Sequence, residues 1–327
     1  MSMTRRGFMS ALSVASLSLS VSSCGSSGSG SGGGTDIRFG YIADYNGASL
    51  LAVADEQGLW KKHGISASYK TFVNGPIQIQ ALGTGNLDYG YIGPGAMWLP
   101  ASGKSKIVAI NTLTYADRVI VKPGITSLTG LKGKKVGVPE GTSGEMVLNL
   151  ALRRAGMTMD DIDKVVMDAP TVVSAFASGQ IDGAGIWYPL IATIKEKVPG
   201  LVEVASTREI GGSFPTAFVA GNEVQPATNE KVVKVLQEAN DWRAAHHEES
   251  VALAAKLLKV PEDKVKADAA NVETMTTADL VAKTKDGTVG TWLDGMSDFF
   301  ARTGQLEQAP AADTFYSADV YTKAAAR

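Results

Sequence analysis

Short apolar segments alternate with amphipathic segments along most of this chain, and this alternation constrains the fold more than any other feature. The strand-like segments are residues 37–41, 66–72, 86–92 and 106–113, and helical segments at residues 49–57 and 76–82 lie among them. Strands that alternate with helices form βαβ units, in which the strands build a mostly parallel sheet. The sequence therefore predicts an α/β fold.

The clearest of these units joins a strand at residues 135–139 to a helix at residues 145–154. The turn between them contains Gly141, Thr142, Ser143 and Gly144. Glycines let the backbone approach closely, and the threonine or the serine is suited to cap the helix. The first amides of a helix lack partners within the helix, so we predict that this turn binds an anion. An ordinary capped turn is the alternative interpretation.

Composition narrows the class of protein. The 327 residues are 44% hydrophobic and 20% charged, with a formal net charge of -2, which suits one or two globular domains. A nucleic-acid-binding protein needs a basic face to neutralise phosphates, and no block of Lys and Arg follows the N-terminal region. No run of 18 or more apolar residues follows position 25, so we expect no bilayer-spanning segment there.

The first 24 residues have the features of an export signal. Arg5 and Arg6 lie in a run that resembles the twin-arginine signal, and an apolar stretch follows at residues 11–21. The segment that ends at Cys24 resembles the lipobox of bacterial lipoproteins, and Cys24 is the sole cysteine of the chain. We expect a lipid anchor at Cys24, followed by a Gly/Ser tether at residues 25–35. The alternative is a signal that is cut elsewhere.

Four segments of the remaining chain resemble, in order and spacing, the periplasmic substrate-binding proteins of ABC importers. They are residues 51–64 (LAVADEQGLWKKHG), 81–93 (ALGTGNLDYGYIG), 130–139 (GLKGKKVGVP) and 179–189 (GQIDGAGIWYP). The resemblance is to the class that binds nitrate, sulfonates, taurine and thiamine precursors, and it extends over about residues 36–325.

This resemblance implies the type II periplasmic-binding-protein fold, with two α/β lobes joined by two crossover strands. Each lobe is then a mostly parallel sheet flanked by helices. The implied boundaries are residues 36–119 for the first part of lobe 1, 120–219 for lobe 2 and 220–327 for a mainly helical return to lobe 1. The implied crossover strands are residues 119–123 and 217–221.

Enzyme signatures are incomplete in this sequence. The nucleophile-elbow pattern Gly-x-Ser-x-Gly fails because Glu145 follows Gly144. Of the three histidines, His246 and His247 are adjacent on a predicted helix, where they do not converge easily on one metal, and His63 stands alone in a turn. We therefore expect a binding protein, with no catalytic residue, no metal site and no cofactor.

Candidate ligand-binding residues follow the strands, because ligands of such α/β proteins lie at the carboxyl ends of the strands. Two small-residue turns are candidates for holding an anion with their amides. They are Gly93, Pro94, Gly95 and Ala96 in one lobe, and Gly141, Thr142, Ser143 and Gly144 in the other. Neither turn contains Lys or Arg, so helix dipoles and hydroxyl groups would neutralise the anion.

Aromatic and polar side chains complete the predicted site. Tyr45, Tyr115, Trp187 and Tyr188 are candidate aromatic walls, with core or hinge packing as the alternative. Asp44 is placed to pair with a ligand ammonium group such as that of taurine, although an Asp before a helix is more often a cap. Asn46 and Asn74 have amides suited to orienting a polar ligand, with turn formation as the alternative, and Thr216 is the candidate with the weakest signal.

Together these features predict a monomeric, lipid-anchored receptor on the outer face of the cell membrane that delivers its solute to an ABC permease and its cytoplasmic ATPase. By resemblance, the first expectation is an aliphatic sulfonate or taurine. Nitrate, bicarbonate, an aromatic acid and a pyrimidine precursor of thiamine remain alternatives. The rival functions are an enzyme of the thiamine-pyrimidine-synthase type and a sensory receptor that presents its ligand to a membrane kinase.

Overall fold

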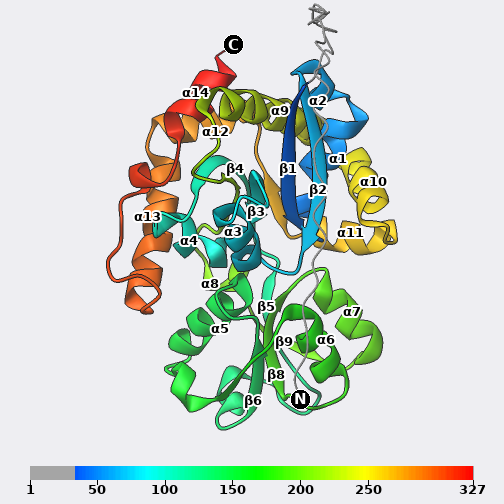
Figure 1. Ribbon diagram of the computed structural model, residues 1–327. Helices are drawn as coiled ribbons and strands as arrows, with labels where there is room; N and C mark the ends of the chain where they lie inside the picture. Colours follow the sequence, from blue (N-terminus) through cyan, green and yellow to red (C-terminus); the bar gives the residue numbers. More distant parts are fainter. Residues whose placement is uncertain (1–33, 327) are drawn as a thin grey trace, which may run out of the picture. The chain divides into compact units, whose positions relative to one another are not determined.

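The computed structural model describes residues 34–326, which include two β-sheets and their flanking helices (Figure 1). The expected export signal, the expected lipidation site Cys24 and most of the expected tether lie outside the described residues. Within residues 34–326, none of the helices combines the length and the apolar character that crossing a membrane requires.

The larger sheet, sheet A, contains six strands and lies in the upper half of Figure 1. β1, β2 and β3 run parallel to one another, whereas β10 runs antiparallel to its neighbours β3 and β4, and β11 runs antiparallel to β4. Across the sheet the strands are β11 (Val272–Thr274), β4 (Lys106–Thr114), β10 (Pro215–Ala220), β3 (Tyr89–Ile92), β1 (Thr35–Ile42) and β2 (Ile65–Phe72).

The smaller sheet, sheet B, contains five strands and lies in the lower half of Figure 1. β6 runs parallel to β7 and β8, and β5 runs antiparallel to both of its neighbours. Across the sheet the strands are β7 (Asp163–Val166), β6 (Lys135–Val138), β8 (Gly183–Trp187), β5 (Asp117–Val121) and β9 (Val202–Ser206). Both sheets contain mostly strands of one direction, as predicted.

The chain passes between the two sheets twice. It leaves sheet A after β4 and enters sheet B at β5, with only residues 115–116 between the two strands. It returns through residues 207–214, between β9 and β10. The crossover segments that the resemblance implies overlap β5 and β10. Each of these strands runs antiparallel to both of its neighbours.

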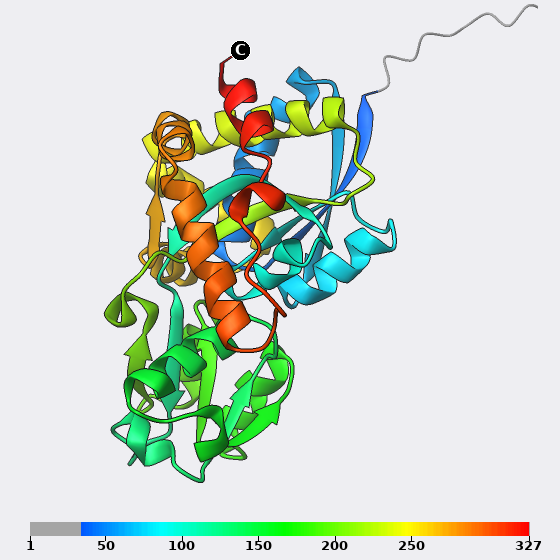
Figure 2. The same cartoon turned by 90° about the vertical axis from the view of Figure 1, so that its left-hand side faces the viewer.

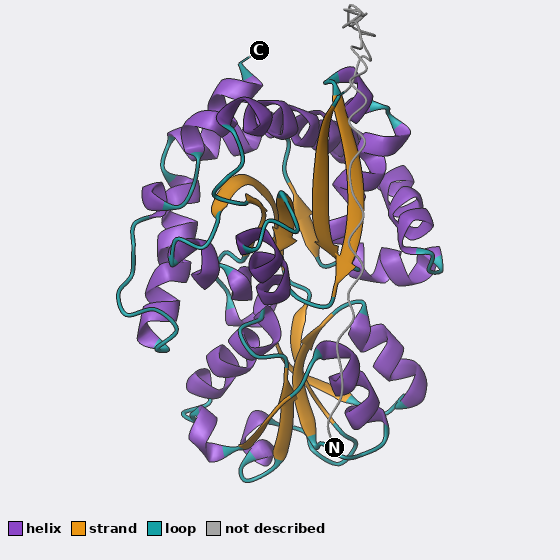
Figure 3. Ribbon diagram, viewed as in Figure 1, coloured by secondary structure: helices purple, strands orange, loops and turns teal. Residues whose placement is uncertain are grey.

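Helices flank both sheets (Figure 3). They are α1 (Tyr45–Glu56), α2 (Leu59–Lys62), α3 (Gly75–Gly83), α4 (Trp98–Ala101), α5 (Ser143–Arg154), α6 (Ala169–Ala177), α7 (Leu190–Lys197), α8 (Thr207–Ile210), α9 (Pro226–Ala245), α10 (His247–Leu258), α11 (Glu262–Ala269), α12 (Thr277–Lys285), α13 (Thr288–Arg302) and α14 (Ala318–Ala325). Short 3₁₀ turns are η1 (Pro94–Ala96), η2 (Leu128–Leu131), η3 (Met159–Asp161) and η4 (Ala312–Thr314). The mainly helical C-terminal third includes α13, which extends down to the helices of sheet B (Figure 2).

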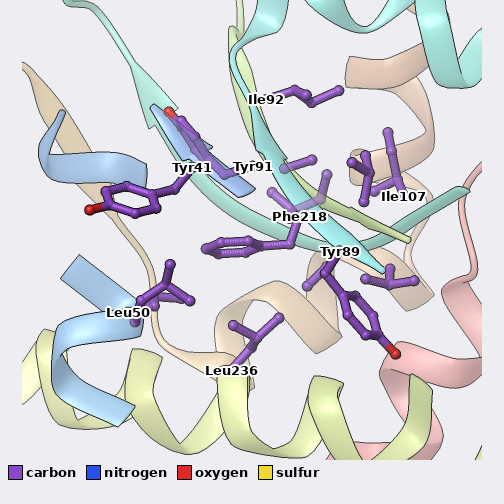
Figure 4. Close-up of a cluster of buried hydrophobic side chains, with 14 of the residues drawn as sticks. Tyr41, Leu50, Tyr89, Tyr91, Ile92, Ile107, Phe218 and Leu236 are labelled. Carbon is purple, nitrogen blue, oxygen red and sulfur yellow. The ribbon is translucent and has the colours of Figure 1, made fainter. Parts of the chain in front are cut away.

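Each sheet has its own apolar core. In sheet A, Tyr89 and Tyr91 of β3 and Phe218 of β10 pack in one cluster with Leu50 of α1 and Leu236 of α9 (Figure 4). In sheet B, Ile120 of β5 packs in a cluster with α6 and α7, whereas its neighbours Val119 and Val121 pack in a second cluster with α5, as the two-residue period of a strand requires.

Candidate functional site

The carboxyl end of β1 leads directly into helix α1. The side chain of Asp44 accepts a hydrogen bond from the Gly47 amide at 2.6 Å, which makes Asp44 the N-cap of α1. The helix consequently begins at Tyr45, four residues earlier than the sequence pattern predicts. Tyr45 and Asn46 therefore lie in the first helical turn and not in a loop. Asn74 has the same role at α3, where it accepts from the Ile77 amide at 3.0 Å.

A pocket lies where the carboxyl end of β1 and its neighbours in sheet A meet the start of β5 and the end of β8 in sheet B. Its volume is about 30 Å³, and since a cavity holds one water from roughly 10–15 Å³, it has room for about two waters. Ten of the sequence-predicted residues line it: Asp44, Asn46, Asn74, Gly93, Pro94, Ala96, Thr142, Ser143, Trp187 and Tyr188. The structure thus brings predicted residues of both sheets together around one small space.

The pocket lining also includes seven residues that were not among the predicted site residues: Ile42, Gly75, Tyr91, Thr114, Ala116, Asp117 and Asp268. Asp117 is the first residue of β5, and its position at the start of an apolar segment was the only available signal. Asp268 comes from α11 in the helical C-terminal third, where helical periodicity gives no indication that a residue faces a distant pocket.

Three of the lining residues are buried aspartates, and their carboxyl groups influence one another. Asp44, Asp117 and Asp268 are 6%, 1% and 1% exposed. Burial raises the pKa of Asp44 to about 7, with the Gly47 amide opposing the rise and Asp117 adding to it. Burial also raises the pKa of Asp117 to about 6, although Ser143 and Arg118 lower it. Burial and the charge of Asp44 raise the pKa of Asp268 well above its usual value.

Two carboxylate oxygens of this group have no hydrogen-bond partner. Oδ2 of Asp268 accepts from the Tyr45 amide at 2.7 Å. In contrast, Oδ1 of Asp268 and Oδ1 of Asp117 are both buried and unpartnered among residues 34–326. Buried polar atoms are nearly always hydrogen-bonded, so these two acceptors are exceptions that require an explanation.

Asn46 is held in place by a buried polar network. The Thr112 hydroxyl donates to Oδ1 of Asn46 at 2.7 Å, and Thr216 Oγ1 lies 2.8 Å from Thr112 Oγ1. The side-chain amide of Asn111 donates to the Asn46 carbonyl at 3.0 Å, and Arg243 donates to the Asn111 carbonyl at 3.2 Å. Because Thr112 occupies the amide oxygen of Asn46, the NH2 group of Asn46 is the part available to a ligand.

The turn before α5 has an internal partner for one of its amides. The Gly141 amide donates to Oε2 of Glu145 at 2.8 Å, so a carboxylate of the chain already occupies this part of the predicted anion site. A Cβ built at Gly95 would lie 2.0 Å from the Ser143 nitrogen, which means that the two predicted anion-binding turns press against each other. A Cβ at Gly144 would lie 2.4 Å from the Gly185 carbonyl oxygen, so Gly144 allows α5 to pack on β8.

The other predicted residues lie outside the pocket. The Tyr45 hydroxyl lies 2.7 Å from Ser250 Oγ, on the side of α1 that faces α10. The Tyr115 hydroxyl donates to Glu273 at 3.2 Å, and the Arg208 guanidinium lies over the Tyr115 ring. Thr216 belongs to the network behind Asn46.

Gly141 lines a separate hollow of about 620 Å³, which also lies between the sheets. The Trp98 indole N–H donates to the Gly141 carbonyl at 3.3 Å, so α4 of the sheet A half contacts the turn before α5. Gly95 and Gly144 line neither of these spaces and serve close backbone packing.

The aromatic pair at the end of β8 lies at the sheet B side of the pocket. Trp187 is buried, whereas Tyr188 is half-buried and directs its hydroxyl to Glu203, 2.7 Å away. The Arg118 guanidinium lies 5.5 Å from the centre of the Tyr188 ring. The hydroxyl of Tyr188 is therefore engaged with Glu203, and its ring is the part available to the pocket.

Comparisons with known proteins agree with this architecture. A sequence profile of the NMT1/THI5-like family matches residues 48–249. A protein of Brucella abortus (strain 2308) that is named as a binding protein is 53% identical over 291 residues, which cover 88% of this chain and 91% of the relative. The taurine-binding periplasmic protein of Escherichia coli (strain K12) is 23% identical over 217 residues, which cover 63% of this chain and 68% of the relative.

Solved structures share the fold. The crystal structure of the periplasmic aliphatic sulphonate binding protein from Escherichia coli matches with a TM-score of 0.68 at 20% identity, over 88% of this chain and 99% of that chain. This likeness confirms the predicted two-lobed fold of periplasmic binding proteins. The names of the relatives also agree with the expectation of a binding protein rather than an enzyme.

Proposed function

Because this chain belongs to the NMT1/THI5-like family, we propose that it is the solute receptor of an ABC importer and that the solute binds at the pocket between its two sheets. The pocket has a volume of about 30 Å³ in the present arrangement, so it must widen to admit a solute. The observation that carries this proposal is the pocket itself, whose lining comes from sheet A through Asp44 and Asn46 and from sheet B through Ser143 and Trp187. A solute that contacts both halves stabilises the arrangement in which they are close, which is how hinged receptors select a closed state.

For the solute, we propose a small organic molecule of the sulfonate and taurine type. Relatives from Bacillus subtilis and Escherichia coli carry names that refer to aliphatic sulfonates and taurine, which supports this class. In the pocket, the NH2 group of Asn46 is a donor suited to a sulfonate oxygen, and the positive end of the α5 dipole lies in the same lining. Nitrate, bicarbonate, aromatic acids and pyrimidine precursors of thiamine belong in the same binding screen.

The proposed location is extracytoplasmic, with a lipid anchor at Cys24 that holds a monomer close to the permease and its ATPase. The periplasmic relatives support export of the folded part, and the sequence before Gly25 supports the anchor. A sensory role would use the same pocket but a different membrane partner. Co-purification from crosslinked membranes with a permease, and not with a membrane kinase, is the result expected for an importer.

The binding proposal is tested by a thermal-shift screen of the purified protein against sulfonates, taurine, nitrate, bicarbonate, carboxylates and aminopyrimidines. A ligand at a concentration of about 100 Kd adds roughly 2.7 kcal/mol to the free energy of unfolding, which is a readily measured shift. Binding in the pocket predicts that Asn46→Ala reduces the shift. A shift that is unchanged in this variant would place the ligand elsewhere.

A further inference from the structure

We infer that the solute carries a cationic nitrogen group with at least two N–H donors, and that Asp44, Asp117 and Asp268 select this group. The inference rests on the proposed function, because it specifies the solute of the same pocket. It narrows the solutes to those with an ammonium or amidinium group, such as aminosulfonates and small amines, and it excludes plain alkanesulfonates and inorganic anions.

The charge of the lining is the first observation. Three carboxyl groups come from three separate elements: the N-cap of α1, the first residue of β5 and helix α11. Among the described residues, no Lys, Arg or His lines this pocket. Buried charges are costly unless they are paired, so an added anion would meet up to three negative charges without a cationic side chain in the lining to offset them.

The unpartnered oxygens are the second observation. Asp117 and Asp268 line the pocket from the two halves of the molecule, and Oδ1 of each is a fully buried acceptor without a partner among the described residues. A carboxylate accepts hydrogen bonds and does not donate them, so a ligand satisfies these atoms only with N–H or O–H donors. An ammonium or amidinium group supplies several donors and the opposite charge together, and such charge-assisted hydrogen bonds are the strong ones.

The three aspartates offer acceptors from three separate elements of the pocket lining. Within residues 34–326, no group of three or more His, Cys, Asp and Glu side chains is arranged to hold a metal ion. A cationic group with several N–H donors can bond to more than one of these carboxyl groups. The aromatic faces of Tyr91 and Trp187 in the same lining are compatible with a positive charge.

The test compares solutes that share a skeleton and differ in charge. Taurine has an ammonium group where isethionate has a hydroxyl group, and the two are otherwise identical. Acetamidinium and acetate have the same planar shape and opposite charges. Isothermal titration of the full chain at pH 7.5 is expected to show that at least one cationic member binds at least 30-fold more tightly than its counterpart. Isethionate or acetate binding as tightly as its cationic counterpart would overturn the inference and leave the proposed function intact.

A screen in which none of these compounds binds, and no aminopyrimidine binds, would overturn the proposed sulfonate and taurine class and the inference with it.

The variants Asp117→Asn and Asp268→Asn keep the side-chain shape and remove the charge, and each is expected to weaken binding of the cationic solute at least 30-fold. Asp36→Asn is the matched control, because Asp36 is exposed at the opposite end of β1 from the pocket.

A further readout separates a direct role from a structural one. Binding of a cation favours the ionised carboxyl groups, so titrations at pH 6.5 in buffers of different ionisation enthalpy are expected to show proton release, and less of it in Asp117→Asn. Equal affinity of the wild type and both aspartate variants for the cationic solute, with unchanged melting temperatures, would overturn the assignment of these residues.

Discussion

The backbone amide of Tyr45 donates a hydrogen bond of 2.7 Å to Oδ2 of Asp268, a residue 223 positions away in the sequence. This bond joins the first turn of α1 to α11, near the other end of the chain. Asp268 also lines the pocket together with Asp117, and its second oxygen has no hydrogen-bond partner among the described residues. One long-range contact therefore forms part of the fold and of the candidate site together.

The Tyr45 bond predicts different effects for two substitutions of Asp268. Asp268→Asn keeps an acceptor for the Tyr45 amide and removes a buried charge, so we expect stability equal to or above that of the wild type at pH 7.5. Asp268→Ala leaves the amide buried without a partner, which costs about 1–3 kcal/mol. Urea unfolding measures both values. Equal stability of the two variants would show that the hydrogen bond contributes nothing.

The buried carboxyl groups predict a pH dependence of stability. Asp117 has a folded-state pKa of about 6 against an ordinary value of 3.8. The folded state therefore binds the proton more tightly, and this stabilising contribution is complete below about pH 3.8 and is lost as the pH rises through about 6. Asp44 behaves in the same way, and its contribution is lost progressively as the pH rises from about 3.8 through about 7.

The measurement is the difference in unfolding free energy between Asp117→Asn and the wild type at several pH values. The asparagine does not titrate, so we expect this difference to move in favour of the variant by on the order of 2 kcal/mol between pH 4 and pH 8. Asp44, Asp268, Tyr91 and Arg118 also act on this region, and they are present in both proteins. A difference that does not change with pH would contradict the raised pKa.

Close packing of α5 on β8 predicts that Gly144 contributes to the stability of the folded state. A Cβ at Gly144 would lie 2.4 Å from the Gly185 carbonyl oxygen, so we expect Gly144→Ala to lower the free energy of unfolding by about 1–3 kcal/mol. Gly290→Ala is the control, because nothing lies within 4 Å of a Cβ at this position of α13. The control is expected to be neutral or to stabilise by up to about 1 kcal/mol. Equal melting temperatures for the two variants would contradict the contact.

The proposed lipid anchor predicts the location of the protein in the cell. Cys24→Ser removes the thiol that would carry the lipid, so we expect the protein to move from the membrane fraction to the soluble extracytoplasmic fraction. Ser23→Ala is the control and should remain in the membrane fraction. Fractionation followed by immunoblotting measures both. Retention of Cys24→Ser in membranes would refute the anchor.

The sequence by itself determined the architecture, because the information needed was local. Strand and helix periods repeat over short windows, and so the alternation of elements predicted an α/β fold. The division into two lobes was implied by the resemblance to the binding-protein family. The strand predicted at residues 106–113, for example, is β4 (Lys106–Thr114). The cap formed by Asp44 was also predicted, as the alternative to ligand binding, because a capping side chain bonds to an amide only three residues away.

Only the tertiary structure decided which side chains share the pocket. Asp117 and Asp268 are far from Asp44 in the sequence, and no local pattern indicates that the sheets bring the three together. The predicted anion-binding turn also depends on three-dimensional contacts, because Glu145 folds back on the Gly141 amide and Gly95 presses on Ser143. Burial in turn raises the pKa values of the aspartates, because removing water penalises their charged form, and burial exists only once the chain has folded.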